Sequence, residues 1–522
     1  MRNISRTHTI IAVIFFVSIY VSCLGYVFKL DCFQGLHENR TYSRLPALSL
    51  EYSKLMAYPD EFEDNFNDHF GLRQIYIFLN NYMKYMYLGL SGSPKVDIGK
   101  DQWLFFAITF TGYHDSSVFT PDLLDRWKLS LEIKKAWFLK QGIRYYFTII
   151  PNKNTIYPEY VPQKYARKET STPIDQLTEH LRQNSTVPFV DVKETLLNAK
   201  NGTYTLYYKT DTHINYYGAF HIANRLLQAV SQEVPACIPL NISEFTVTSK
   251  TGRGGDLSRM LGLDSLITDQ WIIFEPNSSW SFTSPTPEEI FYPDTIFVKN
   301  ADDPVIETRN ISQALPNALV FRDSCGHGVL PFLSERFSYI RYIWEHLGIL
   351  IPIETLIEEV QPDVVIEEVV ERNLIFDKPQ LPPDISKALY HLADKEIMRL
   401  DGMDCSRIFT QHKKANFLLA KQNFIIPLGS FAENSAEFIV LEFDIQSEEP
   451  SEMVISHRTK RVSEYNENTA YHINLNKGRN TVYVTLLSTC ITGDVKCNFS
   501  SDLKNYTVHS VAAKRLGVDA LY

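Results

Sequence analysis

The sequence predicts an α/β domain with a parallel sheet and helices on both faces, followed by an antiparallel β-sandwich and preceded by a transmembrane helix. Three observations predict this order: an apolar run near the N-terminus, short buried-strand patterns that alternate with helical periodicity, and two-residue alternation near the C-terminus. The chain has 522 residues, 44% of them hydrophobic and 13% aromatic. It is therefore long enough for roughly two or three domains.

The N-terminal segment predicts a membrane anchor. Arg2 and Arg6 precede an uncharged run from Thr9 to Phe28, and about 20 residues in a helix span a bilayer. The positive-inside rule places residues 1–8 in the cytoplasm and the rest outside. The alternative is a cleaved signal peptide with Gly25 at a possible cleavage site. Either way, we expect an extracytoplasmic protein, periplasmic or at the cell surface.

The middle of the chain alternates between helix and strand patterns. Apolar residues recur at helical spacing over Pro121 to Lys140, and Tyr145 to Ile150 then form a compact apolar run typical of a buried strand. The same alternation continues as a helix at 174–181 and strands at 187–192, 318–321 and 363–366. Such alternation predicts a parallel sheet covered by helices.

A proline-punctuated stretch follows Arg372, and the sequence after about Cys405 becomes strand-like. Strands are expected at 438–445, 453–456 and 506–511, and alternation on both sides of Lys477-Gly478 predicts a hairpin. These patterns indicate the β-sandwich. The expected division is a cytoplasmic tail (1–8), an anchor (9–28), a linker (29–57), an α/β domain (58–375), a second linker (376–405) and the sandwich (406–522).

Charge and cysteine content exclude several classes of function. Lys and Arg total 51 against 61 Asp and Glu, so the net charge is −10, without the basic stripe that nucleic acid binding requires. None of the seven cysteines forms a CxxC pair, so zinc and thioredoxin-like sites lack their ligand spacing. Cys490 and Cys497 flank a short segment and are either a disulfide or two unpaired thiols.

Two segments carry residues suited to acyl transfer. In Lys209-Thr210-Asp211-Thr212-His213, Asp211 and His213 lie two residues apart just before a predicted helix, so an extended backbone would place both on one face. Ser324 follows the strand at 318–321 and precedes Gly326, a position typical of a nucleophile. Cys325 is a second candidate. Alternatively, these residues are ordinary helix caps.

A third segment supplies candidates for substrate binding. Asn152 and Lys153 follow the strand that ends at Ile150, where the side chains of an α/β sheet commonly line a site. A structural asparagine turn explains the same pattern.

Eight short motifs, in order between about Tyr58 and Arg372, resemble one known family. They are Asn67–Arg73, Gly99–Phe105, Pro151-Asn152-Lys153, Tyr157-Pro158-Glu159, Lys209–His213, Gly255-Asp256-Leu257, Arg322-Asp323-Ser324 and Pro362–Val365. The family is that of the SGNH-hydrolase-like O-acetyltransferases typified by the alginate acetylation proteins AlgX and AlgJ. The resemblance implies an SGNH-like fold with Asp211, His213 and Ser324 as the catalytic triad. The order of the triad reverses that of ordinary SGNH hydrolases, and triads depend on geometry alone.

The resemblance also implies an activity and its partners. Acetyl groups would move through a Ser324 acetyl-enzyme onto an exported polysaccharide, with Asn152, Lys153 and Arg322 as candidate substrate-binding residues and backbone N–H groups of Ser324 and Cys325 binding the oxyanion. A polytopic membrane-bound O-acyltransferase would supply acetyl groups, and no metal, nucleotide or other cofactor is implied. Ile214 stands where the family usually has Trp, and Cys325 stands where it has an aromatic residue. These departures concern acceptor specificity, because both neighbours are expected to shape the pocket.

Two other functions remain open from the sequence. A carbohydrate acetyl esterase would use the same triad with water as the acceptor. A non-catalytic polysaccharide-binding scaffold would keep the same segments for structural reasons and use the sandwich for binding.

Overall fold

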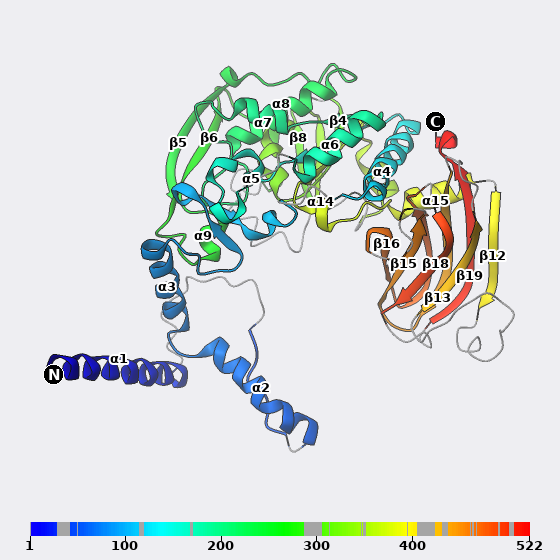
Figure 1. Ribbon diagram of the computed structural model, residues 1–522. Coiled ribbons are helices and arrows are strands. Elements are labelled where there is room, and N and C mark those ends of the chain that lie inside the picture. Colours follow the sequence, from blue (N-terminus) through cyan, green and yellow to red (C-terminus); the bar gives the residue numbers. More distant parts are fainter. Residues whose placement is uncertain are drawn as a thin grey trace.

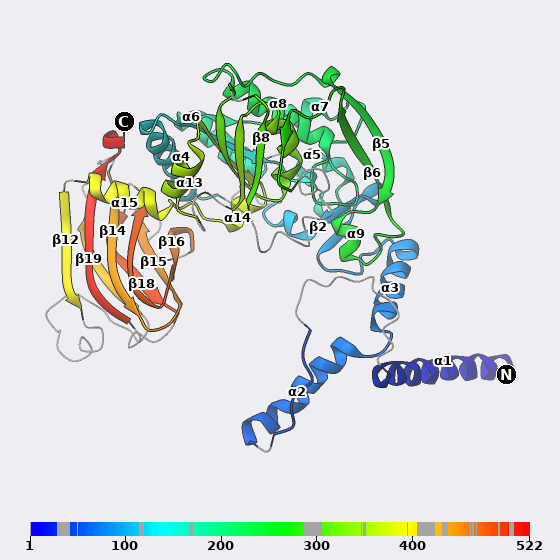
Figure 2. The same ribbon diagram turned by 180° about the vertical axis from the view of Figure 1, so that it is seen from behind.

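The computed structural model describes residues 2–28, 42–49, 51–113, 119–166, 171–286, 305–312, 314–345, 347, 351–393, 395–403, 423–430, 437–459, 461, 464–465, 467–488, 491–500 and 506–521. Figure 1 shows N-terminal helices, an α/β domain, and a β-rich region beside α4 that includes the C-terminus. Figure 2 shows the same arrangement from behind.

The α/β domain is built on a mixed sheet that has seven strands within the described residues. Its order is β4 (Phe189–Val190), β3 (Arg144–Ile150), β11 (Val364–Val370), β9 (Asn317–Arg322), β10 (Tyr339–Trp344), β8 (Val305–Asn310) and β7 (Phe282–Thr283). The pairings from β4 to β10 are parallel, whereas β8 pairs antiparallel with both β10 and β7. The sheet therefore has a parallel part, as expected, and an antiparallel edge that the sequence patterns did not indicate.

Helices cover both faces of this sheet. Alternate side chains of β3 enter two different buried clusters, with Tyr145 and Phe147 in one and Tyr146 and Ile150 in the other. The first cluster contains residues of α4 (Pro121–Lys140), α6 (Pro173–Asn184) and α13 (Ile353–Val360). The second contains residues of α7 (Lys193–Ala199), α8 (Tyr216–Val230) and α12 (Leu330–Ser334).

The β-rich C-terminal region contains two antiparallel sheets, each with four strands among the described residues. One has the order β12 (Lys395–Met403), β19 (Tyr506–Gly517), β14 (Glu437–Ser447) and β17 (Gly478–Leu486). The other has the order β13 (Asn423–Ser430), β18 (Ile491–Phe499), β15 (Ser451–Thr459) and β16 (Ala470–Leu475). The hairpin predicted around Lys477-Gly478 is wrong, because β16 pairs with β15 while β17 pairs with β14. Alternation marks the buried face of each strand but does not choose its partner.

The two predicted linkers contain regular structure. Helix α2 (Tyr52–His69) begins inside 29–57, and 376–405 includes α15 (Pro383–Leu392) and all of β12. Helix α15 packs on the C-terminal sheets through Ile385 and Leu389, which belong to the same buried cluster as α4. The buried Arg126 of α4 donates hydrogen bonds to the carbonyls of Asn468 and Ala470 at 2.8 and 2.9 Å. These contacts join the α/β domain to the β-rich region.

Helix α1 (Arg2–Val27) includes residues 9–27 of the anchor predicted at 9–28. Among the described residues, its stretch His8–Tyr26 is long and apolar enough to cross a bilayer, with a mean hydropathy of 2.2, a test that signal sequences also pass. Cys490 and Cys497 are the two cysteines near the C-terminus that the sequence leaves as either a disulfide or unpaired thiols, and Cys497 is a buried free thiol. Cys490 lies outside the described residues.

Candidate active site

Asp211 and His213 lie in a loop that enters α8. An isolated bridge between Tyr207 and Ile214 closes the loop. Asn215 caps α8 by accepting hydrogen bonds from the N–H groups of Tyr217 and Gly218, as expected of an asparagine at this position. The loop is thus held at the helix start, with its polar side chains together.

The Asp211 carboxylate orients the His213 ring. His213 Nδ1 lies 2.6 Å from Asp211 Oδ1, and the same oxygen accepts the His213 backbone N–H at 2.9 Å. Burial lowers the pKa of His213, but the Asp211 charge more than reverses this and raises that pKa above its ordinary value. Burial in turn raises the pKa of Asp211, but the His213 charge and hydrogen bonds outweigh it and hold that pKa below its usual range. The pair is arranged so that Nδ1 donates to the carboxylate.

A second carboxylate, Asp256 at the start of α9 (Asp256–Met260), lies beside this pair. Its Oδ2 is 3.7 Å from His213 Nδ1 and accepts the Thr212 hydroxyl at 2.5 Å. The backbone N–H of Asp256 donates to Asp211 Oδ2 at 2.7 Å. Burial, and then the Asp211 charge, raise the pKa of Asp256 to about 6. The sequence placed Asp256 in a motif without giving it a role.

Gly255 allows Asp211 to approach α9. A Cβ atom at this position would lie 2.3 Å from both Cβ and Oδ2 of Asp211, far inside van der Waals contact. Oxygen and nitrogen atoms of Asp211, His213 and Asp256 all lie within 4.8 Å of one another. The hydrogen bonds described above already occupy both oxygens of Asp211, so the proximity of the three groups is explained by the network itself.

Two further buried ionisable side chains, Lys153 and Asp269, hold the loop that carries His213. The Lys153 ammonium donates to the carbonyls of Tyr208, Lys209 and Asp211 at 3.1, 3.2 and 2.7 Å. Asp269 Oδ2 accepts both the hydroxyl and the N–H of Thr210 at 2.6 Å. Burial lowers the pKa of Lys153 to about 8. These contacts fix the backbone of the loop rather than its reactive atoms.

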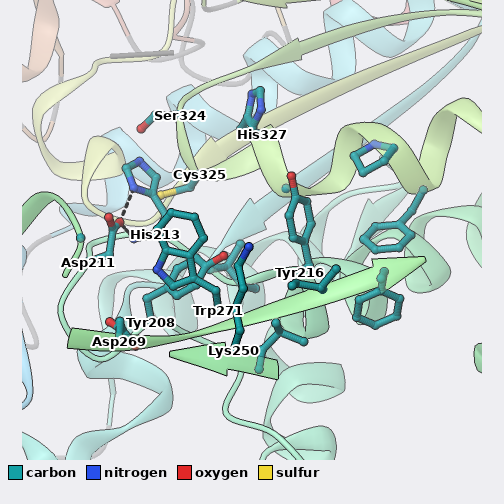
Figure 3. Close-up of a pocket in the computed structure, with 18 of the residues that line it drawn as sticks. Tyr208, Asp211, His213, Tyr216, Lys250, Asp269, Trp271, Ser324, Cys325 and His327 are labelled. Atoms are coloured by element: carbon teal, nitrogen blue, oxygen red, sulfur yellow. Dashed lines mark hydrogen bonds and ion pairs between the residues drawn. The ribbon is translucent and has the colours of Figure 1, made fainter. Parts of the chain in front are cut away.

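Ser324 follows β9 and immediately precedes the 3₁₀ helix η7 (Cys325–Val329). The preceding residue shapes this turn: Asp323 accepts hydrogen bonds from the N–H groups of Cys325 and Val370, both at 2.7 Å. The Asp323 N–H donates to Glu368 Oε2 at 3.0 Å. The Ser324 side chain is left partly exposed. Figure 3 shows the His213 ring between Asp211 and Ser324.

Cys325 is poorly suited to act as the nucleophile. Its side chain is 2% exposed, and burial raises its pKa to about 12 although the Arg372 guanidinium lies 3.3 Å from its sulfur. The thiolate is the nucleophilic form of cysteine. At neutral pH this thiol therefore stays protonated and packs as an apolar side chain.

The triad candidates face one cavity of about 360 Å³. One part of it is lined by Asp211, His213, Ser324 and Cys325. Ile214, which stands where the family usually has Trp, also lines the cavity. Aromatic and other side chains complete the wall: Tyr208, Tyr216, Lys250, Trp271, Phe274, Trp280, His327 and Phe332. Several of these belong to the hairpin of β5 (Phe245–Arg253) and β6 (Thr268–Pro276). The sequence reading missed this hairpin, since its residues carry no catalytic pattern.

The three predicted substrate-binding side chains do not line this cavity. Lys153 is 4% exposed and holds the loop, while Asn152 is 5% exposed and donates its N–H to Glu371 at 2.8 Å. Arg322 is 2% exposed, and its guanidinium lies 5.4 Å from the centre of the Trp344 ring. Their burial argues against direct contact with substrate. The corrected interpretation gives them positions behind the site.

Comparison with known proteins identifies the domain around the loop. Residues 96–275 match the family described as the SGNH hydrolase-like domain of the acetyltransferase AlgX. This part of the chain is similar to that domain. The resemblance deduced from the motifs is thereby confirmed. The match includes Asp211 and His213 and ends before Ser324.

A curated relative and several solved structures are similar to the chain. The probable alginate O-acetylase AlgJ of Pseudomonas aeruginosa is 26% identical over 180 residues, which are 34% of this chain and 44% of that protein. The chain thus matches less than half of AlgJ. PatB1 of Bacillus cereus is 16% identical, with 53% of this chain and 97% of that chain covered and a TM-score of 0.41. AlgX of Pseudomonas aeruginosa is 11% identical, with 81% and 94% covered and a TM-score of 0.36.

Proposed function

We propose that this chain is an O-acetyltransferase that moves acetyl groups onto hydroxyls of an exported or cell-surface polysaccharide. The observation that carries the proposal is the 2.6 Å contact between His213 Nδ1 and Asp211 on the wall of a cavity that Ser324 also lines. The match of residues 96–275 to the AlgX domain supports transfer to a sugar over hydrolysis. The similarity to AlgJ, a probable alginate O-acetylase, supports a polysaccharide acceptor.

The first half-reaction forms an acetyl-enzyme. His213 Nε2 takes the Ser324 hydroxyl proton while Ser324 Oγ bonds to the acetyl carbon of the donor, and the bond from that carbon to the donor group breaks. The proton then passes from His213 to the departing group. Asp211 holds the ring in the tautomer that this requires and stabilises the imidazolium.

The second half-reaction reverses these roles. His213 takes a proton from a sugar hydroxyl, the sugar oxygen bonds to the acetyl carbon, and the bond to Ser324 Oγ breaks. The proton returns to Ser324. The aromatic side chains of the β5–β6 hairpin supply apolar faces against which a sugar ring can pack.

The oxyanion site differs from the sequence-based expectation. The Cys325 N–H already donates to Asp323 at 2.7 Å. The Ser324 N–H has no acceptor among the described residues, and we assign it as one oxyanion donor. Cys325 then contributes through the turn that its N–H stabilises.

The setting of the domain follows from the same proposal. Helix α1 anchors the chain in the membrane with the α/β domain outside, the two C-terminal sheets form a sandwich that contacts the polymer, and a polytopic O-acyltransferase delivers the acetyl groups. No cofactor takes part in the steps above.

Ser324→Ala tests the proposal. In the purified full chain, this variant should release no p-nitrophenol from p-nitrophenyl acetate above the uncatalysed rate, and mass spectrometry should find no acetyl group in its 324 peptide. Cys325→Ala is the matched control and should retain both. Unchanged acetyl release by Ser324→Ala would refute the catalytic role. Transfer to an oligosaccharide panel then separates transferase from esterase.

A further inference from the structure

An apolar surface on α3 (Arg73–Met83) and the following π-helical turn η1 (Lys84–Leu88) is separate from the cavity. We call it the α3–η1 face, and it consists of Leu79, Met83, Met86, Tyr87, Leu88 and Leu90, which are between 46% and 74% exposed. Lys84 is the one charged side chain between Arg73 and Lys95 in the sequence. A cluster of this kind on a soluble surface marks an interaction site.

The spacing of these residues makes the surface one-sided. Leu79, Met83, Met86 and Tyr87 follow one another at intervals of four, three and one, which places them on one side of a helix. The other side is packed against the α/β domain. Tyr85 is 8% exposed in a cluster with Leu257 and Leu261 of the α9 region, with Phe78 and Tyr82 at its border.

The α3–η1 face is also fixed relative to α1. The Gly71 N–H donates to the Ser22 carbonyl at 3.2 Å, and the Ser22 hydroxyl donates to the Tyr76 hydroxyl at 3.1 Å. The two backbones meet closely, because a Cβ on Gly71 would lie 2.3 Å from the Gly25 Cα. Helix α3 therefore begins beside the last turns of α1, and Figure 1 shows it between α1 and the α/β domain.

We propose that the α3–η1 face lies in the surface of the lipid bilayer that α1 enters. This rests on the anchoring role given to α1 under the proposed function. A lipid surface fits because the face adjoins the candidate span directly, and because methionine, leucine and tyrosine beside a single lysine suit the boundary between acyl chains and head groups. The face would thus hold the α/β domain in a fixed orientation on the membrane.

The contact extends to the proposed site through α9. Leu257 packs with Tyr85 in the same cluster, and Asp256 next to it accepts hydrogen bonds from Thr212. One packed unit therefore joins the lipid-facing surface to the loop that carries His213. The cavity has a set orientation toward the bilayer rather than swinging on a flexible tether.

Photolabelling by lipid tests this proposal on the full chain. The protein is placed in phosphatidylcholine nanodiscs that contain a phosphatidylcholine with a diazirine on its acyl chain, and adducts are mapped by mass spectrometry. We expect adducts in α1 and in residues 79–90. Ile238 and Ile242 are 57% and 42% exposed and should stay unlabelled, as apolar side chains elsewhere on the domain.

A double variant, Met83→Asp with Tyr87→Asp, should lower labelling of residues 79–90 at least about fivefold and leave α1 labelling unchanged, because charges resist burial in lipid. Leu197→Asp, at a position 40% exposed on α7, is the control and should change neither.

Labelling of α1 without residues 79–90 would overturn the proposal and keep the anchor. Labelling of residues 79–90 without α1 would refute the anchor and with it the arrangement proposed here, and absence of both would overturn the two together. Protein cross-links at 79–90 in native membranes, in place of lipid adducts, would overturn it in favour of a protein partner.

Discussion

The loop that carries Asp211 and His213 and the turn that carries Ser324 are held in different ways. Buried ionisable side chains from three other segments fix the loop: Lys153 binds its carbonyls, Asp269 binds Thr210, and Asp256 binds Thr212. At the serine turn, Asp323 accepts two backbone N–H groups at the end of a strand, and Glu368 accepts the N–H of Asp323. Side chains from distant segments thus hold the backbone of the loop while the neighbouring Asp211 orients the imidazole, whereas the serine turn is held at the end of the sheet.

The largest effect on activity is expected from removing the Asp211 charge beside His213. Asp211→Asn removes the charge that holds the His213 tautomer, and the rate of acetyl-enzyme formation should fall about 10⁴-fold, as expected for loss of this carboxylate in a triad. Stopped-flow measurement with p-nitrophenyl acetate gives this rate. An unchanged far-UV circular dichroism spectrum would show that folding is retained, and a loss below tenfold would contradict the role.

Breaking the support of the loop should cost stability. Lys153→Met removes the ammonium donor that three partly buried carbonyls share, of which the Lys209 carbonyl also accepts the Leu104 N–H. The free energy of unfolding of the α/β domain should therefore fall by about 3 kcal/mol. Urea unfolding followed by tryptophan fluorescence measures it. Lys135→Met is the control, because the half-buried Lys135 bonds to Thr186 alone among the described residues and its loss should change little. Equal effects of both variants would refute the special role of Lys153.

The same lysine predicts a pH dependence of stability. Its pKa is about 8 in the folded protein and about 10.4 when unfolded. Unfolding therefore takes up a proton in this window, and the free energy of unfolding from this group should rise as the pH increases from about 8 to about 10.4. Lys153→Met should lack that rise, and a rise identical to that of the wild type would contradict the assignment.

Asp256→Asn tests how much the second carboxylate contributes to the charge state of His213. The Asp256 carboxylate favours the charged form of His213, so removing it should lower the pKa of His213. The pH at which activity reaches half its maximum should shift to lower values by roughly 0.5–1 unit. Asp269→Asn is the contrast, since Asp269 holds the backbone, and it should lower the rate without moving the midpoint. A profile unchanged by Asp256→Asn would refute the coupling.

The smallest effect is expected at the serine turn. Cys325→Ala should leave the rate of acetyl release within about twofold, because the buried thiol is protonated at neutral pH and contributes packing rather than charge. Iodoacetamide should leave Cys325 unmodified in the folded protein, and peptide mapping checks this. Rapid alkylation, or loss of activity in the alanine variant, would contradict this interpretation.

Local pattern was sufficient for much of the α/β domain. The helix expected over Pro121 to Lys140 and the strand ending at Ile150 match α4 and β3, because side-chain periodicity follows directly from helix and strand geometry. The same periodicity did not predict which strands pair with one another. Strands β16 and β17 have the alternation of a hairpin yet join different sheets, and the antiparallel edge of β8 and β7 left no local sign.

The candidate site likewise contains residues that the sequence predicted and residues that it did not. Residue chemistry and motif order pointed to Asp211, His213 and Ser324 from the sequence alone, because these residue types in acyl transfer have few substitutes. Asp256 was overlooked as a partner of the loop because it lies 44 residues beyond Thr212. Lys153 was predicted to bind substrate, because the residues next to it in the sequence do not indicate that it is buried beneath the loop.

The amino-acid sequence alone indicates an apolar N-terminal run, an alternating α/β pattern and a set of side chains able to transfer an acyl group. Tertiary structure decided which of those side chains meet, which are buried as supports, and which apolar residues stay uncovered on α3 and η1. The physical reason is range. Periodicity acts between neighbours along the chain, whereas a hydrogen bond of about 3 Å requires atoms brought together from distant segments.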